Sequence, residues 1–273
     1  MTAGAPATRS SASLAERIGP RLAQLLPPII VFVVLIGLWE VFGKGTLPQP
    51  LSAPSAIAGA LIDNSGLLMR AARATLFEAM GGLFIGTSAG LIMAFAASRF
   101  IVARDILMPI AIGAAAIPLV AMAPIFNNWF GLVNPMSKMA MAALLVFFPV
   151  FISSTRGLVE VSPGSLELMR SYATSDTEVL RKVRIPNMLP FFFTALKVGT
   201  TLAFIGAIVA EYFGGTSEVV GRVVLNAMFS GKFALGWAAI LLGAVAAIVA
   251  YLIVSAIERR AIPWYISLRE DGG

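Results

Sequence analysis

Residues 233–257 read FALGWAAILLGAVAAIVAYLIVSAI and contain no charged side chain. An α-helix rises 1.5 Å per residue, so about 20 apolar residues cross the roughly 30 Å hydrocarbon core of a bilayer. This run is therefore predicted to be a membrane-spanning helix. Five further runs with at most one charged side chain each predict five more spans, at 27–42, 75–98, 106–137, 139–155 and 191–210.

The composition of the whole chain supports the same class. Apolar residues make up 58% of the 273 residues and charged residues 12%, about half the usual share in a soluble domain. The chain has no cysteine and no histidine, which excludes His–Asp triads, histidine-ligated metals, thiol nucleophiles and disulfides. We therefore predict an all-α integral membrane protein and exclude most hydrolase and metalloenzyme functions.

The positive charge of the chain gives the predicted orientation. The formal net charge is +6, from 20 basic and 14 acidic side chains. Basic residues collect in the cytoplasmic segments of membrane proteins, so this excess does not require nucleic acid as a partner. Most lysines and arginines lie in cytoplasmic segments if both termini are cytoplasmic. We predict one membrane domain of six spans over residues 27–257, with cytoplasmic tails at 1–26 and 258–273.

The longest polar segment between predicted spans, residues 156–184, links spans four and five on the cytoplasmic side. Ser162 followed by Pro163 is typical of a helix N-cap and first helical residue. Ser175 and Glu178 form the pattern of a capping box for a second short helix. The segment is thus predicted to be a helix–turn–helix lying along the cytoplasmic surface.

Two prolines, Pro186 and Pro190, are predicted to end the second of these helices before the fifth span begins. The helix–turn–helix has two possible roles. It is either an amphipathic connector that rests on lipid headgroups or a docking element for a soluble partner. Periodicity alone does not decide between them.

The same loop resembles the EAA loop of ABC-importer permeases. The family pattern is E-A-A, three residues, G, nine residues and I-x-L-P. Here residues 167–173 read ELMRSYA and residues 183–186 read VRIP, with the nine-residue spacing kept. Glu167 and Pro186 match the pattern directly. Ala173 takes the place of its glycine, from which we expect that the turn does not require a positive φ.

Further stretches are similar to the nitrate/sulfonate/taurine subgroup of these permeases. They are IPLVAMAP at 117–124 with NWFG at 128–131, FFP at 147–149 and AEYFG at 210–214. The resemblance covers about residues 28–268, which is nearly the whole chain.

The resemblance implies that the chain is the membrane-spanning subunit of an ATP-driven importer in the bacterial plasma (inner) membrane. Two such chains pair, here expected as a homodimer, with two ATPase subunits on the cytoplasmic face. A periplasmic or lipid-anchored solute-binding protein delivers the cargo. The chain itself is expected to be no enzyme and to hold no cofactor, since the ATPase binds ATP and Mg²⁺. The sequence contains no G-x-x-x-x-G-K-[ST] motif.

The cargo is the least determined part of the resemblance. The chain most resembles permeases for thiamine precursors, pyrimidines or riboflavin, and then those for sulfonate, taurine and nitrate. Selectivity in such systems resides largely in the binding protein.

By the same resemblance, the loop at 156–190 is the ATPase-coupling element. Glu167 is then a polar contact at the docking surface, with Leu168 and Met169 as an apolar knob beside it. The arginines of the loop either pair with acidic groups on the ATPase or hold anionic lipid. The expected coupling residues are Glu167, Leu168, Met169, Arg170, Ala173, Arg181, Arg184 and Pro186.

Ionisable and polar side chains within the spans are candidates for the substrate path, because charge is costly there. Lys197 either snorkels to the inner surface, faces a water-filled path or pairs with an acid. Glu211 gates the path, contacts the binding protein or anchors its helix at the interface. Prolines in span three either line the path or only kink a helix. The candidates are Pro118, Pro124, Lys197, Thr200, Thr201, Phe204 and Glu211.

Other features have structural interpretations. Glycines four residues apart in span two predict close helix packing, at 82, 86 and 90. Glu40 and Glu78 are predicted to be interfacial. The outer segments 45–55 and 216–232 are the expected landing sites of the binding protein.

Two other classes of membrane protein would show different sequence features. A secondary transporter that needs no ATPase would usually show more spans, inverted repeats and charged residues at the bilayer midplane. A membrane-embedded enzyme would need clustered acids or histidines at membrane depth. The sequence shows no repeat of fixed period, and its acidic residues are scattered over three predicted outer ends.

Overall fold

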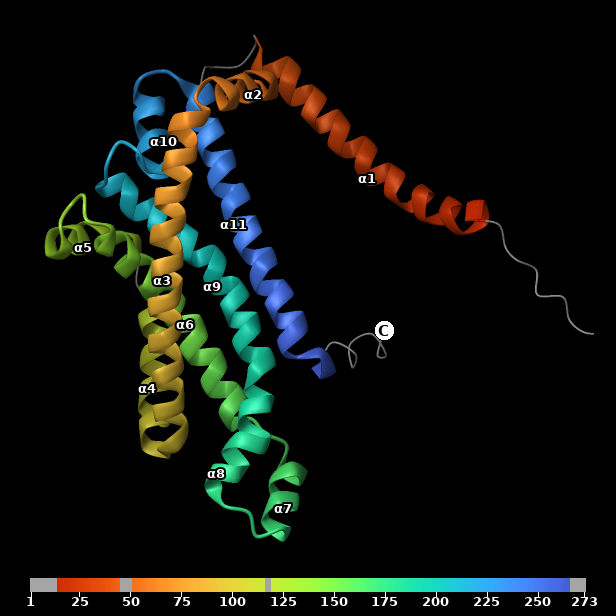
Figure 1. Ribbon diagram of the computed structural model, residues 1–273, viewed down its shortest axis with the longest axis vertical. Coiled ribbons are helices and arrows are strands. Elements are labelled where there is room, and N and C mark those ends of the chain that lie inside the picture. Colours follow the sequence, from red (N-terminus) through yellow and green to blue (C-terminus); the bar gives the residue numbers. More distant parts are fainter. Residues whose placement is uncertain (1–13, 45–50, 116–118, 266–273) are drawn as a thin grey trace, which may run out of the picture.

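The computed structural model describes residues 14–44, 51–115 and 119–265, and within them every regular element is a helix (Figure 1). The elements in chain order are α1 (Leu14–Gly43), α2 (Pro54–Asp63), α3 (Ser65–Arg99), α4 (Ile101–Ala115), η1 (Leu119–Met122), α5 (Ala123–Phe130), α6 (Pro135–Val159), α7 (Pro163–Ser171), α8 (Asp176–Val179), the π-turn η2 (Leu180–Arg184), α9 (Ile185–Phe213), α10 (Val220–Phe229) and α11 (Phe233–Ala261).

Five helical segments of the described residues are long and apolar enough to cross a membrane, which confirms the predicted all-α membrane class. They are Leu26–Gly43, Ser65–Arg99, Pro135–Val159, Asp176–Phe213 and Phe233–Ala261. The run predicted as span three, 106–137, is not among them, because it is divided into α4, η1 and α5. Pro109 lies inside α4, which continues past it, and Pro124 lies in the first turn of α5, where proline is tolerated. Pro118 lies outside the described residues, and a sixth span stays a prediction.

The centre of the bundle is the packing of α3 and α9 against α6. Small residues on α3 make this close approach possible. A Cβ atom at Gly82 would lie 2.3 Å from the Ala142 Cβ, and one at Gly86 would lie 2.4 Å from the Ala143 carbonyl oxygen. The predicted packing role of these glycines is thus confirmed. The buried apolar side chains around this contact include Leu83, Val146, Val150, Ala203 and Phe204.

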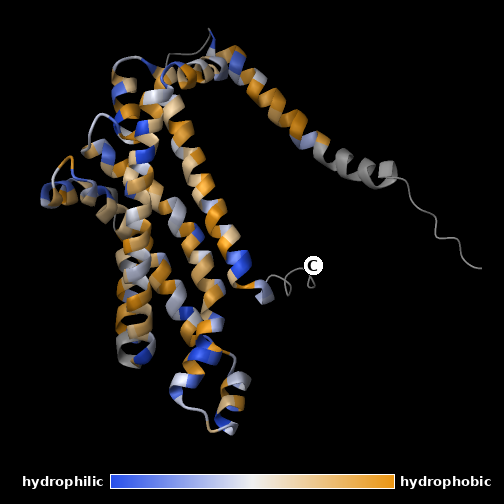
Figure 2. Cartoon of the chain, in the orientation of Figure 1, coloured by the Kyte–Doolittle hydropathy of each residue, from blue (hydrophilic) through white to orange (hydrophobic). Residues whose placement is uncertain are grey.

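The bundle has two distinct ends. Figure 1 shows α2 and α10 at one end, called here the α10 end, and α7 and α8 at the other, called the α7–α8 end. Figure 2 shows that hydrophilic residues gather towards these ends, while the lengths of helix between them are mainly hydrophobic. The hydrocarbon core of the membrane therefore surrounds the middle of the bundle.

The first helix departs from the rest of the bundle. α1 extends away from the other helices in Figure 1, and none of its apolar window Leu26–Gly43 is buried within the chain. Its last turns are held at the α10 end, where Trp39 packs edge-on against Trp237 and Glu40 accepts a hydrogen bond of 2.9 Å from the Ser55 N–H. Lipid or another protein must cover the remaining length.

The α7–α8 hairpin forms as the capping patterns predict. The Ser162 hydroxyl caps α7, which has proline in its first turn, and Ser175 and Glu178 form a complete capping box on α8. The prediction that Pro186 and Pro190 end the second helix is wrong. Helical structure continues from Asp176 to Phe213, because Pro186 falls in the first turn of α9 and the π-turn η2 changes the hydrogen-bond register just before it.

Candidate functional site

The tip of the α7–α8 hairpin presents apolar side chains to its surroundings. Leu168 is 56% exposed and Tyr172 is 72% exposed, although both lie outside the hydrophobic length of the bundle. Glu167 is exposed beside them, and Met169 is half-buried. Exposed apolar side chains rimmed by polar ones mark surfaces that bind another molecule.

The turn between α7 and α8 corrects one prediction from the sequence. Ala173 has a φ of 49°, in the left-handed region that favours glycine. Its N–H donates to the Arg170 carbonyl (2.9 Å), and the Thr174 N–H and hydroxyl both donate to the Met169 carbonyl (3.3 and 2.7 Å). These bonds end α7 only if position 173 is left-handed, so the turn does require the positive φ that the sequence did not predict.

Because an L-residue with a side chain is strained by about 1 kcal/mol in this region, Ala173→Gly is expected to stabilise the hairpin. Glycine also has more conformational entropy than alanine in the unfolded chain, which reduces the expected net stabilisation to about a few tenths of a kcal/mol. Slower proteolysis within residues 163–178 in Ala173→Gly measures this effect. Faster proteolysis in that variant would show that the left-handed turn is not strained.

The base of the hairpin is closed by a residue that the sequence analysis missed. The Asn187 side-chain amide donates to the carbonyls of Gly157 (2.8 Å) and Glu160 (3.1 Å) at the end of α6. A Cβ atom at Gly157 would lie 2.7 Å from the Met188 Cα, so the two chain segments touch there. No local sequence pattern predicts this contact, because the residues that form it are about thirty positions apart.

The three arginines of the expected coupling set lie on different parts of this end. Arg170 is exposed in the last turn of α7, Arg181 is exposed in η2, and Arg184 is half-buried at the end of η2. Pro186 is half-buried in the first turn of α9. The fold thus brings the expected coupling residues to one end of the molecule.

The candidate path residues do not form one site. Thr201 and the ring of Phe204 line an apolar groove of about 500 Å³ between α9 and α11, whereas Thr200 is buried and donates to the Leu196 carbonyl of its own helix (2.8 Å). Pro124 lines a separate hollow beside α5.

Of the three predicted environments of Lys197, the structure shows the pairing with an acidic side chain. Its Nζ atom lies 2.6 Å from a carboxylate oxygen of Glu258 in the last turn of α11, and the two side chains are 20% and 13% exposed. The lysine is therefore paired with an acid across two helices. Exposed pairs have little energetic weight, but this one is largely removed from water.

Glu211 lies in a buried polar cluster at the α10 end. One of its carboxylate oxygens accepts from the Thr75 hydroxyl (2.6 Å) and the other from the Gly221 N–H (2.5 Å). The prediction that Glu78 is interfacial is wrong, since it is 4% exposed and joins the same cluster. Lys138 is fully buried there too and supplies the positive charge that a buried carboxylate needs.

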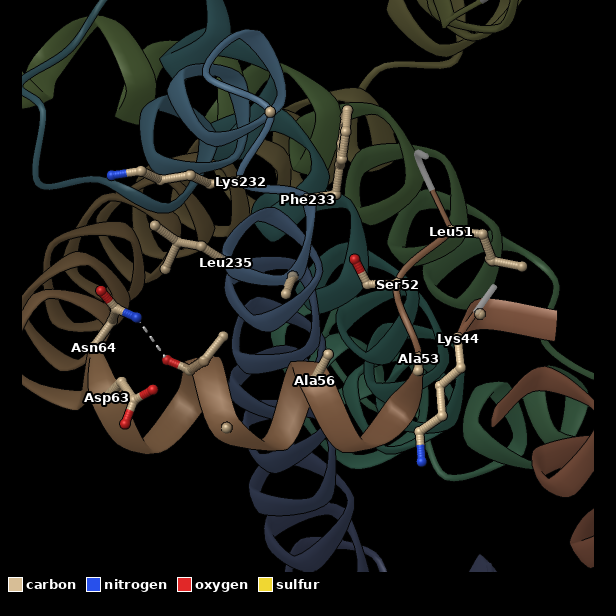
Figure 3. A pocket seen from close by; sticks show the side chains of 15 residues that line it. Lys44, Leu51, Ser52, Ala53, Ala56, Asp63, Asn64, Lys232, Phe233 and Leu235 are labelled. Atoms are coloured by element: carbon tan, nitrogen blue, oxygen red, sulfur yellow. Dashed lines mark hydrogen bonds between the residues drawn. The ribbon is translucent and has the colours of Figure 1, made fainter. Parts of the chain in front are cut away.

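A polar hollow of about 810 Å³ opens at the α10 end (Figure 3). It lies between α2 with the chain leading into it and the turn between α10 and α11, so it is lined by described parts of both predicted landing segments. Residues 45–50 of the first segment lie outside the described residues. The labelled side chains in Figure 3 include Lys44, Asp63 and Lys232, which line this hollow.

Comparison with known proteins places this architecture in a family. Residues 86–263 match the family described as "Binding-protein-dependent transport system inner membrane component". The chain belongs to that family. A probable ABC transporter permease of Haemophilus influenzae is 33% identical to it, over 80% of this chain and 89% of the relative.

Two further permeases match over most of their length. The formylaminopyrimidine transport permease of Halalkalibacterium halodurans is 29% identical over 89% of this chain and 98% of its own. The riboflavin transport system permease of Chloroflexus aurantiacus is 29% identical over 92% and 97%. A solved amino acid ABC transporter has a TM-score of 0.56 at 19% identity, covering 73% of this chain and 96% of that one, which supports the fold.

Membership of this family makes the chain a permease subunit of an ABC importer. It is a multi-pass protein of the plasma membrane. Members of this family work together with a solute-binding protein and an ATPase. The resemblance read from the EAA-like loop and the AEYFG stretch is therefore confirmed at the level of the family.

Proposed function

We propose that this chain forms one half of the translocation path of an ABC importer and that the α7–α8 hairpin docks onto the ATPase. The single observation that carries the docking role is the exposure of Leu168 and Tyr172 at the tip of a helical protrusion beyond the apolar spans. Lipid tails do not reach a tip flanked by Asp176, Arg170 and Glu167. A soluble partner with a matching groove would bury these side chains.

The mechanism follows from the connection of this hairpin to the bundle. α8, η2 and α9 form one uninterrupted helical segment, Asp176–Phe213, so a displacement of the hairpin moves α9. ATP-driven closure of two ATPase subunits would draw two hairpins together and rock the spans between inward-open and outward-open states. Cargo shifts that equilibrium only through its different affinity for the two states.

The assembly we propose contains two copies of this chain, two ATPase subunits and one solute-binding protein. A second copy is supported by α1, whose apolar length is uncovered within a single chain. The binding protein would dock at the α10 end over the hollow of Figure 3, opposite the ATPase. With the hairpin facing the ATPase, both chain termini and the hairpin are cytoplasmic, as the distribution of basic residues predicts.

For the cargo, we propose a small nitrogen heteroaromatic compound such as a pyrimidine precursor of thiamine, or riboflavin. The support is the pair of relatives named for formylaminopyrimidine and riboflavin transport, which match 89% and 92% of this chain. Permeases named for sulfonate, taurine and nitrate match it as well and supply the next candidates. Calorimetric titration of the cognate binding protein with these compounds tests the proposal, and selective binding of an inorganic anion would contradict it.

The docking role predicts that Leu168→Asp lowers the amount of ATPase retained by the detergent-solubilised permease by about tenfold or more, as for an apolar hot-spot residue. The measurement is a pull-down with the co-expressed ATPase, with native mass spectrometry of the eluted complex for its two-plus-two composition. Glu167→Ala and replacement of residues 164–173 by a Gly/Ser linker extend the series.

The matched control is Phe229→Asp, the same kind of change at a side chain that is 85% exposed at the α10 end. It is expected to retain the ATPase fully. Equal retention by Leu168→Asp and the linker variant would make the hairpin a lipid-facing connector. Uptake that persists without ATP would favour a secondary transporter.

A further inference from the structure

α10 begins without a cap of its own. The first N–H groups of a helix have no partner within the helix, and Val219, the residue before α10, supplies no side-chain hydrogen bond. Two residues of other helices accept the hydrogen bonds of these N–H groups instead. Thr75 Oγ1 of α3 accepts from the Val220 N–H (3.0 Å), and Glu211 Oε2 of α9 accepts from the Gly221 N–H (2.5 Å).

The two capping side chains also bind each other. The Thr75 hydroxyl donates to the second Glu211 oxygen at 2.6 Å, so three helices meet in one chain of hydrogen bonds. Thr75 is 1% exposed and Glu211 is fully buried. A buried carboxylate at a helix N-terminus makes charge-assisted bonds and interacts favourably with the helix dipole. We call Thr75 and Glu211 the α10 cap.

The surroundings hold α10 closely against this cap. A Cβ atom at Gly221 would lie 2.6 Å from the Ile208 carbonyl and 2.7 Å from the Glu211 Cβ, so α10 touches the backbone of α9. The Lys138 ammonium offsets part of the acidic charge of the cluster and donates to the Leu132 and Asn134 carbonyls in the connection between α5 and α6. The same cluster thus fixes a second connection at the α10 end.

The cap lies near one end of the segment that begins at the hairpin. Asp176–Phe213 contains 38 residues, which at 1.5 Å per residue is about 57 Å of helix. One end carries the proposed ATPase-docking hairpin and the other carries Glu211. A displacement of α9 at either end therefore reaches the other along an uninterrupted helix.

We infer that the α10 cap is the joint that makes α10 move with α9, and so couples the docking of the binding protein at the α10 end to the ATPase at the α7–α8 end. Thr75 and Glu211 act as positioning residues, because they hold α10 and need not touch the cargo. This inference rests on the proposed function and adds the residues that carry the signal between the two faces.

The first test uses the complex of permease, ATPase and binding protein reconstituted in lipid nanodiscs. Thr75→Val removes the acceptor for Val220 and the donor to Glu211 at nearly constant volume. We expect it to keep the bound ATPase and its basal hydrolysis but to reduce stimulation by the binding protein about fivefold or more, as for loss of a typical coupling between two sites. Glu211→Gln, which leaves one acceptor oxygen, is expected to reduce the stimulation as well.

The matched control is Thr87→Val, the same substitution on the same helix. The Thr87 hydroxyl is buried and has no hydrogen-bond partner in the described part of the chain, so its removal is expected to leave the stimulation unchanged. The two variants differ only in whether the lost hydroxyl belongs to the α10 cap.

A second readout follows α10 itself. Because the chain has no cysteine, Val224→Cys introduces a single thiol on α10 at a position that is 4% exposed. Maleimide labelling of this thiol is expected to accelerate with Thr75→Val and not with Thr87→Val. Ala195→Cys, in the core of α9, is expected to stay protected in both.

Faster labelling of position 224 together with lost stimulation supports the inference. Unchanged labelling would show that the cap does not hold α10, and faster labelling with full stimulation would show that α10 does not carry the signal; either overturns it. A parent complex that binds ATPase but ignores the binding protein would contradict the proposed importer function itself. The response of the parent complex therefore separates the two failures.

Discussion

Lys197→Met is expected to destabilise the bundle by about 3 kcal/mol, the lower end of the range for breaking a buried ion pair. The substitution leaves the Glu258 carboxylate, which is 13% exposed, without the ammonium group that lies 2.6 Å from it. The lower end of the range applies because both side chains retain some contact with solvent. Glu258→Gln should have a similar effect, since it leaves the lysine unpaired.

Thermal unfolding of the detergent-solubilised protein, followed by tryptophan fluorescence, measures this loss. The double variant Lys197→Met/Glu258→Leu is expected to recover most of it, because an apolar pair leaves no buried charge. Lys182→Met serves as the control, because it breaks the exposed Lys182–Glu178 pair and should leave the unfolding temperature nearly unchanged. Equal, small losses in Lys197→Met and Lys182→Met would show that the α9–α11 pair does not stabilise the bundle.

Gly86→Ala is expected to destabilise the bundle by about 2–3 kcal/mol, because overpacking a close helix contact forces the backbones apart. The added methyl group would lie 2.4 Å from the Ala143 carbonyl oxygen and 2.8 Å from the Val146 Cβ. Neither a carbonyl nor a β-carbon can rotate away, so α3 must separate from α6. The higher intrinsic helix propensity of alanine offsets about 1 kcal/mol at most.

The same substitution at Gly37 is the matched control. Gly37 lies in α1, and an added Cβ would meet no atom within 4 Å. Gly37→Ala should therefore unfold at the temperature of the parent protein or slightly above it. If Gly86→Ala were as stable as Gly37→Ala, close packing of α3 on α6 would not hold the bundle together.

Local features of the fold could be predicted from the sequence. The apolar runs predict the helices around 75–98, 139–155, 191–210 and 233–257, since length and composition suffice to identify a span. Ser162 and the Ser175–Glu178 box predict the hairpin, because capping involves residues three positions apart. The spacing of the glycines in α3 predicts the close contact but not its partner, α6.

Features that depend on distant residues could not be predicted. Thr75 and Glu211 are 136 positions apart, and Lys197 and Glu258 are 61 apart, so neither pairing leaves a local signal. Glu78 was predicted to be interfacial because it lies near the start of an apolar run, whereas α3 begins earlier, at Ser65, and carries it inside the bundle. The two prolines of α9 did not end the helix, because Pro186 falls in its first turn and the helix continues through Pro190.

The docking of the hairpin onto the ATPase is tested most directly by site-specific crosslinking. A benzophenone maleimide attached to Tyr172→Cys, the only thiol in the chain, is placed at the exposed tip of the hairpin, and the same probe on Asn226→Cys is placed at the α10 end. In the assembled complex, we predict a crosslink to the ATPase from position 172 and none from position 226. A probe at 172 that reacts with lipid alone, in a complex that hydrolyses ATP, would contradict the account.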